Sequence, residues 1–179
     1  MKVVNLYGGP GCGKSTAAAY LFARLKSKHI DAGLVGEVAK ELIYLGNEVQ
    51  LLNQAKMLGA QYGKLEDFRR SKIQVAVSDS PLAMQVVYCR GLFYYDEIAA
   101  LNKKLDSAFD NINVFIRRCN PYQTNGRMQT EAEAIALDHK IKEFMHDDFH
   151  YIIDATYDDY DFLANEIIKI VDRDLINQF

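Results

Sequence analysis

Short apolar runs alternate along this chain with longer stretches in which apolar residues recur every three or four positions. The short runs predict buried strands, and the longer period predicts amphipathic helices. In one helical stretch, residues 14–28, Ala18, Leu21, Phe22 and Leu25 share a face. We expect strands at residues 2–7, 33–36, 73–78, 112–117 and 151–154. We expect helices at residues 14–28, 38–45, 53–70, 81–90, 95–109, 130–146 and 159–172.

Two local signals support these helix boundaries. Pro81 suits the first turn of a helix, and residues 130–133 have the form of a capping box, with Thr130 followed by Glu133. Strands that alternate with helices are typical of a parallel sheet with crossover helices. We find no repeat, linker or low-complexity segment. The sequence therefore predicts an α/β fold with a single domain over residues 1–179.

Composition narrows the classes of function. The 179 residues are 49% hydrophobic and carry a formal net charge of −3, which disfavours a freely binding nucleic-acid protein because phosphate neutralisation needs a basic surface. Cys12, Cys89 and Cys119 lack metal-ligand spacing, so we expect reduced thiols in a cytoplasmic protein. The chain starts directly with an expected strand, and no apolar run reaches the length of a membrane span.

The clearest chemical signal lies between the first expected strand and the first expected helix. It fits the phosphate-binding pattern G-x-x-x-x-G-K-[ST] at every fixed position. Glycines let backbone N–H groups converge on phosphate oxygens. Lys14 should reach the β- and γ-phosphates, and Ser15 should hold Mg²⁺ with Thr16 nearby as a second hydroxyl. The nucleotide-binding residues expected here are Gly8, Gly9, Pro10, Gly11, Cys12, Gly13, Lys14, Ser15 and Thr16.

Two carboxylates stand at the ends of expected strands, where ligands bind in sheets of this type. Asp79 follows the third strand, and we expect it to hold Mg²⁺ together with Ser15; the alternative is a cap of the next helix. Glu37 follows the second strand, where it could accept a proton from a substrate hydroxyl. The alternative for Glu37 is a surface residue in the first turn of the following helix.

An arginine-bearing segment follows the fourth expected strand. Arg117 and Arg118 end the strand, and residues 119–129 form a candidate lid that includes Arg127. Arginine can stabilise the negative charge of a transferring phosphoryl group. Arg127 is therefore the first candidate for this role and Arg118 the second, with an exposed loop arginine as the alternative.

Three weaker features remain open. Arg69 and Arg70 could anchor a substrate phosphate or lie at a solvated helix end. The aromatic cluster of Tyr88 and residues 93–95 could stack on a base, although packing is the commoner role of such residues. Residues 154–157, after the fifth expected strand, could contact the nucleotide base.

These residues resemble those of small P-loop kinases of the nucleoside and nucleotide type. A closer resemblance is to the AAA-type ATP-binding group that includes the nicotinamide riboside kinase domain and phage-encoded nucleotide and DNA-base kinases. It is carried by residues 7–16, 35–41, 77–82, 120–127 and 130–134. In many relatives an arginine follows the aspartate of the third strand, whereas Ser80 stands there in this chain. The resemblance implies a five-stranded sheet ordered 2-3-1-4-5 and transfer of the ATP γ-phosphate to a small acceptor.

Three functions therefore follow from the sequence. The first is an ATP-dependent kinase that phosphorylates a hydroxyl or phosphate of a nucleoside- or nucleotide-type acceptor. The second is a polynucleotide kinase that acts on a hydroxymethylated base, 5-hydroxymethyluracil, in DNA. The third is an ATPase or nucleotide-driven switch without an acceptor. ATP is favoured over GTP because the Asn-Lys-x-Asp guanine motif is absent. A homodimer is left open, and no membrane partner is expected.

Overall fold

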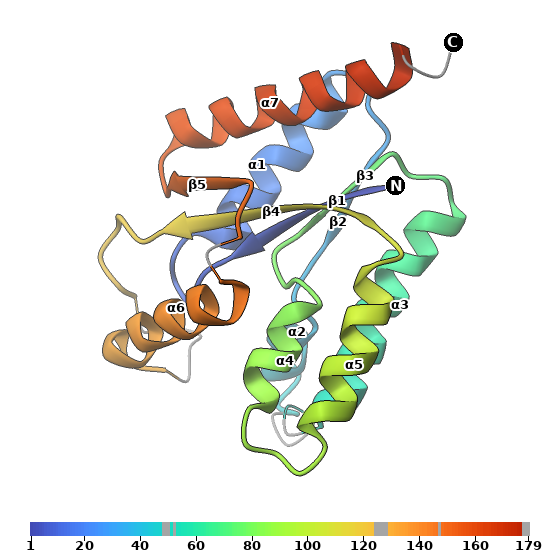
Figure 1. Ribbon diagram of the computed structural model, residues 1–179. Helices are drawn as coiled ribbons and strands as arrows, with labels where there is room; N and C mark the ends of the chain where they lie inside the picture. Colours follow the sequence, from blue (N-terminus) through green and yellow to red (C-terminus); the bar gives the residue numbers. More distant parts are fainter. Residues whose placement is uncertain (48–50, 52, 124–128, 147, 177–179) are drawn as a thin grey trace.

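The computed structural model describes residues 1–47, 51, 53–123, 129–146 and 148–176. Five strands are each followed by one or two helices, seven in all, along this part of the chain, as Figure 1 shows. The strands are β1 (Lys2–Tyr7), β2 (Ala32–Val35), β3 (Val75–Ser78), β4 (Asp110–Arg117) and β5 (Tyr151–Asp154). The helices are α1 (Lys14–Ser27), α2 (Val38–Tyr44), α3 (Gln54–Arg70), α4 (Ala83–Cys89), α5 (Tyr95–Asp106), α6 (Glu131–Met145) and α7 (Tyr157–Ile176).

The strands form one sheet in the order β2-β3-β1-β4-β5, and each neighbouring pair is parallel. This arrangement confirms the expected α/β fold and the order that the family resemblance implied. Parallel strands place all their carboxyl ends at one edge of the sheet. Consequently the segments that follow β1, β2, β3 and β4, which carry the candidate site residues, all begin at the same edge (Figure 1).

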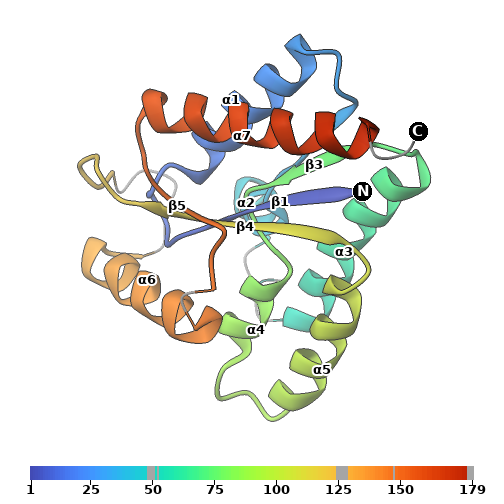
Figure 2. The ribbon, with the colours of Figure 1, turned by 45° about the horizontal axis from the view of Figure 1, so that its top comes forward.

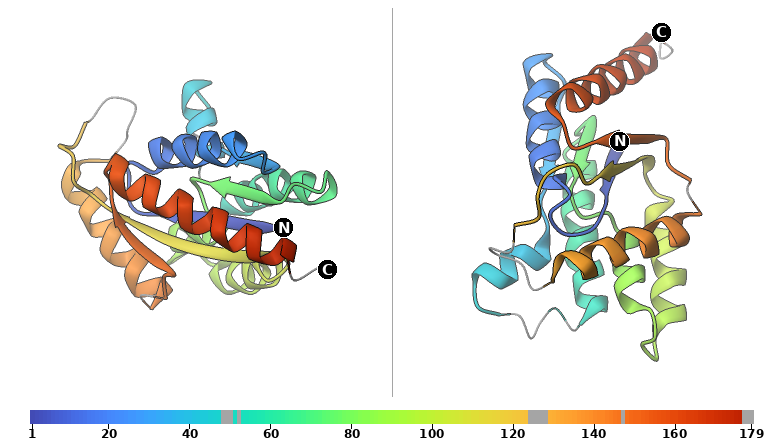
Figure 3. Two further views of the ribbon diagram at one scale, coloured as in Figure 1. Left: turned by 90° about the horizontal axis from the view of Figure 1, so that it is seen from above. Right: turned by 90° about the vertical axis from the view of Figure 1, so that its left-hand side faces the viewer.

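Helices cover both faces of the sheet. Helices α1 and α7 pack side by side on one face, and α3, α4, α5 and α6 lie on the other (Figures 2 and 3). Successive side chains of a strand point to opposite faces, and β1 shows this directly. Val4 and Leu6 enter the core under α1 and α7, whereas Val3 and Tyr7 enter the cores on the opposite face. None of the helices described is long and apolar enough to span a membrane.

Four predicted helix ends differ from the structure by two or more residues: α7 continues to Ile176 and not to residue 172, and hydrogen bonds explain the other three. Helix α4 begins at Ala83 because the Pro81 carbonyl accepts from the Met84 N–H, a tighter turn that leaves Pro81 outside the helix. Helix α5 ends at Asp106, since the following residues continue in tight turns. Helix α7 begins at Tyr157, where the Thr156 hydroxyl accepts from a first-turn N–H. The capping box of α6 is confirmed.

Two glycines give a test of this packing. Gly33 of β2 faces Phe68 of α3, and a Cβ there would lie 2.4 Å from the ring. We expect Gly33→Ala to lower the free energy of unfolding by about 1–3 kcal/mol, because ring and strand must separate. Gly59 in α3 has open space around it, so Gly59→Ala should raise that free energy by about 0.5–1 kcal/mol. Urea unfolding measures both; a stabilising Gly33→Ala would contradict the packing.

Candidate active site

A cavity of about 490 Å³ lies beside the carboxyl edge of the sheet. One end is formed by residues 8–15, the segment that the sequence predicts to bind phosphate and that is called the P-loop below. Most of the other lining residues come from α2, α3 and α4, and Gln129 completes the wall. Its lining residues are Pro10, Gly11, Gly13, Lys14, Ser15, Thr16, Glu37, Ala39, Lys40, Ile43, Leu51, Gln54, Met57, Asp79, Ser80, Met84, Gln85, Tyr88 and Gln129. The cavity therefore joins the expected phosphate site to a second compartment with mostly apolar walls.

The P-loop has the backbone conformation that its glycines predict. Gly13 adopts a φ of 103°, and a Cβ there would lie 2.8 Å from the Tyr160 hydroxyl. The Lys14 ammonium donates hydrogen bonds to the carbonyl oxygens of Gly8 and Gly9 at 2.6 and 3.1 Å. Lys14 is thus held against the loop and could exchange these carbonyls for phosphate oxygens. Ser15 and Thr16 begin α1, where the helix N-terminus favours an anion.

Asp79 meets Ser15 across the cavity. The Ser15 hydroxyl donates to Asp79 Oδ2 at 2.9 Å, and Asp79 is only 6% exposed. Asp79 Oδ1 is buried and has no hydrogen-bond partner among the described residues. A carboxylate and a hydroxyl supply the oxygen ligands that Mg²⁺ prefers, with water completing its shell. The pair therefore fits a magnesium ion. The alternative role as a helix cap does not apply, since Leu82 is the N-cap of α4.

Glu37 precedes α2 and lines the same cavity. Its side chain makes no capping hydrogen bond to that helix, so the carboxylate remains available to a ligand. Burial is the main cause of a raised Glu37 pKa; the Lys14 charge opposes this shift and the Asp79 charge adds to it. Lys40 also lowers the pKa. A carboxylate with a raised pKa beside a phosphate site is suited to accept a proton from a substrate hydroxyl.

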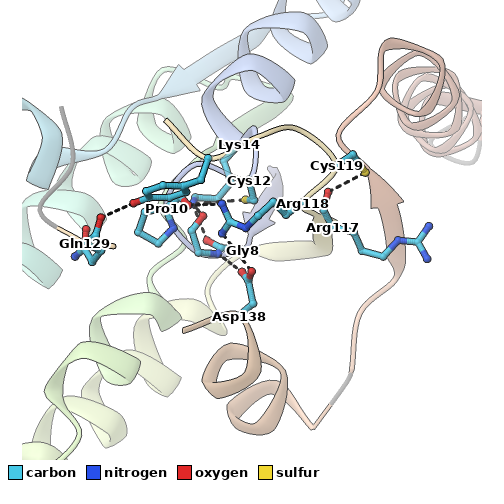
Figure 4. Close-up of polar contacts among 11 residues, drawn as sticks. Gly8, Pro10, Cys12, Lys14, Arg117, Arg118, Cys119, Gln129 and Asp138 are labelled. Carbon is cyan, nitrogen blue, oxygen red and sulfur yellow. Dashed lines mark hydrogen bonds and ion pairs between the residues drawn. The ribbon is translucent and has the colours of Figure 1, made fainter. Parts of the chain in front are cut away.

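The two strand-end arginines occupy different places (Figure 4). Arg117 points away from the P-loop and pairs with Asp154 at 2.6 Å. Arg118 lies against the P-loop, where it donates to the Pro10 carbonyl at 2.7 Å and pairs with Asp138 at 3.3 Å. The Arg118 side chain is thus enclosed and already paired in this structure, and its role as the second candidate for stabilising a phosphoryl group stays a prediction. Arg127 lies outside the described residues.

The structure brings Tyr88 and Asp138 near the site; the sequence analysis named Tyr88 only as one member of an aromatic cluster and did not name Asp138. Tyr88 of α4 lines the cavity, and its pKa is raised by burial and then by the nearby Glu37 charge. Phe93, from the same aromatic cluster, is 97% exposed and packs edge-on against Tyr94. Within this cluster, the position of Tyr88 therefore supports the base-stacking interpretation.

Asp138 was not expected at the site because an aspartate within a charged helix is typical of a solvent-facing position.

Arg69 and Arg70 lie far from the cavity. They end α3, whose opposite end carries Gln54, and a 17-residue helix is about 25 Å long. Both arginines pair with Glu66, at 2.8 and 3.0 Å, and these hydrogen bonds lower the pKa of Glu66 to about 2. They therefore form a local surface cluster, as the solvated-helix interpretation predicted, and do not anchor a substrate phosphate in this cavity.

Comparison with known proteins places this geometry in a family. A family model described as an AAA domain matches residues 3–159. The chain belongs to this AAA domain family. The match spans the P-loop, Glu37, Asp79 and Arg118 of the AAA domain and ends at the start of α7. A search of the curated proteins finds no match.

Solved structures resemble the AAA domain over nearly its whole length. The structure titled APE1195 has a TM-score of 0.54 at 14% identity, with 96% of this chain and 94% of that chain covered. The APS kinase CysC of Mycobacterium tuberculosis, solved as a Cys556Ala mutant and with AMPPNP and APS, has a TM-score of 0.50 at 20% identity, with 96% and 97% covered. At these low identities, the TM-scores show that the chain shares the fold of these structures and nothing more.

Proposed function

We propose that the AAA domain is an ATP-dependent phosphotransferase that moves the γ-phosphate to a hydroxyl of a nucleoside-type small molecule. The observation that carries this proposal is the shared cavity, in which Glu37 faces the same space as Lys14 and the Ser15–Asp79 pair. A nucleotide-binding switch needs the phosphate site alone. A kinase also needs a second compartment with a proton acceptor beside the phosphate, and this cavity has both.

The reaction follows from the positions of these groups. Glu37 takes the proton of the acceptor hydroxyl while the oxygen of that hydroxyl bonds to the γ-phosphorus. The bond between the γ-phosphorus and the β–γ bridging oxygen then breaks, which releases ADP. Lys14 stabilises the negative charge on the transferring group. Ser15 and Asp79 would hold Mg²⁺, which supplies further charge neutralisation when bound. Arg127 stays the proposed lid arginine.

The walls of the second compartment support a nucleoside-type acceptor. Ile43, Met57, Met84 and Tyr88 give apolar and aromatic surface that can cover a flat base. Amide side chains from the same helices, Gln54 and Gln85, could hydrogen-bond the polar edge of such a base. This combination of mostly apolar walls and a few polar groups is typical of small-molecule sites.

An acceptor panel tests the proposal. ADP release is measured with matched nucleosides, nucleoside monophosphates and DNA oligomers with and without 5-hydroxymethyluracil. We expect release to rise with one or more nucleosides and to saturate with their concentration. Stimulation by the modified DNA alone would favour the polynucleotide kinase. Hydrolysis unaffected by every acceptor would contradict a kinase and favour the ATPase.

The metal site gives a separate prediction. Asp79→Asn should raise the Mg²⁺ concentration for half-maximal activity by about tenfold or more, because the carboxylate charge that attracts the ion is lost. Ser15 keeps its hydroxyl in this variant. A Mg²⁺ titration of ADP release measures the shift, with Asp106→Asn as the control, since Asp106 ends α5 ahead of β4 and does not line the cavity. An unchanged Mg²⁺ requirement in Asp79→Asn would contradict the assignment.

A further inference from the structure

A closed set of hydrogen bonds ties the P-loop to α6 and to the end of β4. Asp138 Oδ1 accepts from the Gly9 N–H, and Asp138 Oδ2 pairs with the Arg118 guanidinium. Arg118 donates in turn to the Pro10 carbonyl at 2.7 Å. Asp138 and Arg118 thus hold two consecutive residues of the loop (Figure 4), and neither side chain lines the cavity.

The first contact fixes the peptide bond between Gly8 and Gly9. In a planar trans peptide the N–H and the C=O point in opposite directions. The N–H of this peptide meets Asp138, and its carbonyl on the other side accepts from Lys14 at 2.6 Å. Asp138 therefore sets the peptide plane on which the Lys14 ammonium rests. The N–H of Gly9 is also occupied, so phosphate must be bound by N–H groups further along the loop.

The second contact fixes the peptide bond between Pro10 and Gly11 by the same argument. Its carbonyl is held by Arg118 outside the cavity, so the Gly11 N–H points to the opposite side. Pro10 and Gly11 both line the cavity. Arg118 therefore aims one backbone donor toward the place where phosphate oxygens are expected, before any nucleotide binds.

The pair is built into the fold with its charge neutralised. The side chains of Arg118 and Asp138 are 11% and 18% exposed, so each is largely removed from water. A carboxylate this close to a phosphate site would repel the anion if it were not paired. Gly9 is required by the close approach of α6, because a Cβ there would lie 2.5 Å from the Ala134 carbonyl oxygen.

We propose that Asp138 and Arg118 are positioning residues that preset two peptide planes of the P-loop for phosphate binding. They act on the nucleotide through the backbone and touch neither substrate. The inference depends on the loop binding nucleotide phosphates, which is one part of the proposed function, but not on the transfer reaction or its acceptor. Binding measurements therefore test it independently of kinase activity.

Isothermal titration with MgATP and with tripolyphosphate tests the pair directly. We expect Asp138→Ala and Arg118→Ala each to raise the Kd of both ligands by about tenfold, the loss expected for one charge-assisted hydrogen bond. The matched control is Arg117→Ala, which removes the neighbouring exposed ion pair with Asp154. Its Kd values should stay within about twofold of wild type. An equal loss in Arg117→Ala would overturn the proposal.

Two further variants separate positioning from folding. Asp138→Asn keeps an oxygen for the Gly9 N–H and should fold even if Asp138→Ala does not; we expect its Kd for MgATP to rise about threefold. The double variant Arg118→Ala/Asp138→Ala should lose about tenfold, as one unit, and not about a hundredfold. The proposal would be overturned if the Kd of Asp138→Asn is unchanged and the losses of the two single variants multiply in the double variant. If wild type binds MgATP but transfers no phosphate, the kinase proposal fails and this inference stands.

Discussion

Lys14→Met is expected to reduce phosphoryl transfer by at least about 10³-fold, one of the two largest effects expected in the site. The ammonium lies at the end of the cavity where the phosphates are expected, held by two carbonyl oxygens of the P-loop. Methionine keeps the length of the side chain and removes its charge. Turnover should therefore collapse while the fold, measured by thermal unfolding, is kept.

Lys28→Met is the control for this substitution. Lys28 is an exposed lysine that ends the same helix, α1, at the opposite end from Lys14. Its loss should leave turnover within about twofold of wild type. Substantial turnover in Lys14→Met, within about tenfold of wild type, would show that the phosphates bind elsewhere or that another cation supplies the charge.

Glu37→Gln is expected to lower kcat by about 10²- to 10⁴-fold, the range for loss of a general base. The Kd for MgATP should stay within about twofold, because Glu37 faces the acceptor compartment. Glu41→Gln is the matched control: Glu41 lies on the same helix, but its carboxylate pairs with Lys64 at 2.6 Å. A Glu37→Gln enzyme with wild-type kcat would remove the proton acceptor from the mechanism.

The pH dependence gives the same residue a second test. The proposed transfer requires ionised Glu37, so kcat should fall as pH drops through a pKa raised above the ordinary glutamate value by burial. This acidic limb should vanish in Glu37→Gln. The folded state also binds the Glu37 proton more tightly than the unfolded state does. The contribution of Glu37 to the free energy of unfolding therefore falls as pH rises through the raised pKa. Glu37→Gln should therefore unfold at a higher temperature than wild type near neutral pH.

The parts of the site that the sequence predicted are those with local signals. The P-loop is defined by its own spacing, and Glu37 and Asp79 are placed by the rule that parallel strands end at one edge. The strand order itself came from the resemblance to known kinases, since periodicity alone does not order strands. Gly33 shows what the sequence of a strand does not predict, because the contact between Gly33 and Phe68 depends on how α3 crosses the sheet.

The parts that the sequence missed depend on partners distant in the chain. Arg118 looked like a lid residue because it adjoins a polar loop, but its partners are Pro10 and Asp138, brought together only when α6 packs on the P-loop. Tyr88 could be placed in packing or in the pocket until the direction of α4 was known. The prediction that Pro81 lies in the first turn of α4 was wrong for a local reason, because a proline can also stand just before a helix.

The fate of the γ-phosphate tests the central claim most directly. The protein is incubated with ATP labelled in the γ-phosphate and each member of the acceptor panel, and the label is separated as ATP, inorganic phosphate or phosphorylated acceptor. We expect wild type to move label to a hydroxyl of a nucleoside-type acceptor and Glu37→Gln not to do so. Label that reaches inorganic phosphate alone, whatever acceptor is present, would contradict the proposed phosphoryl transfer.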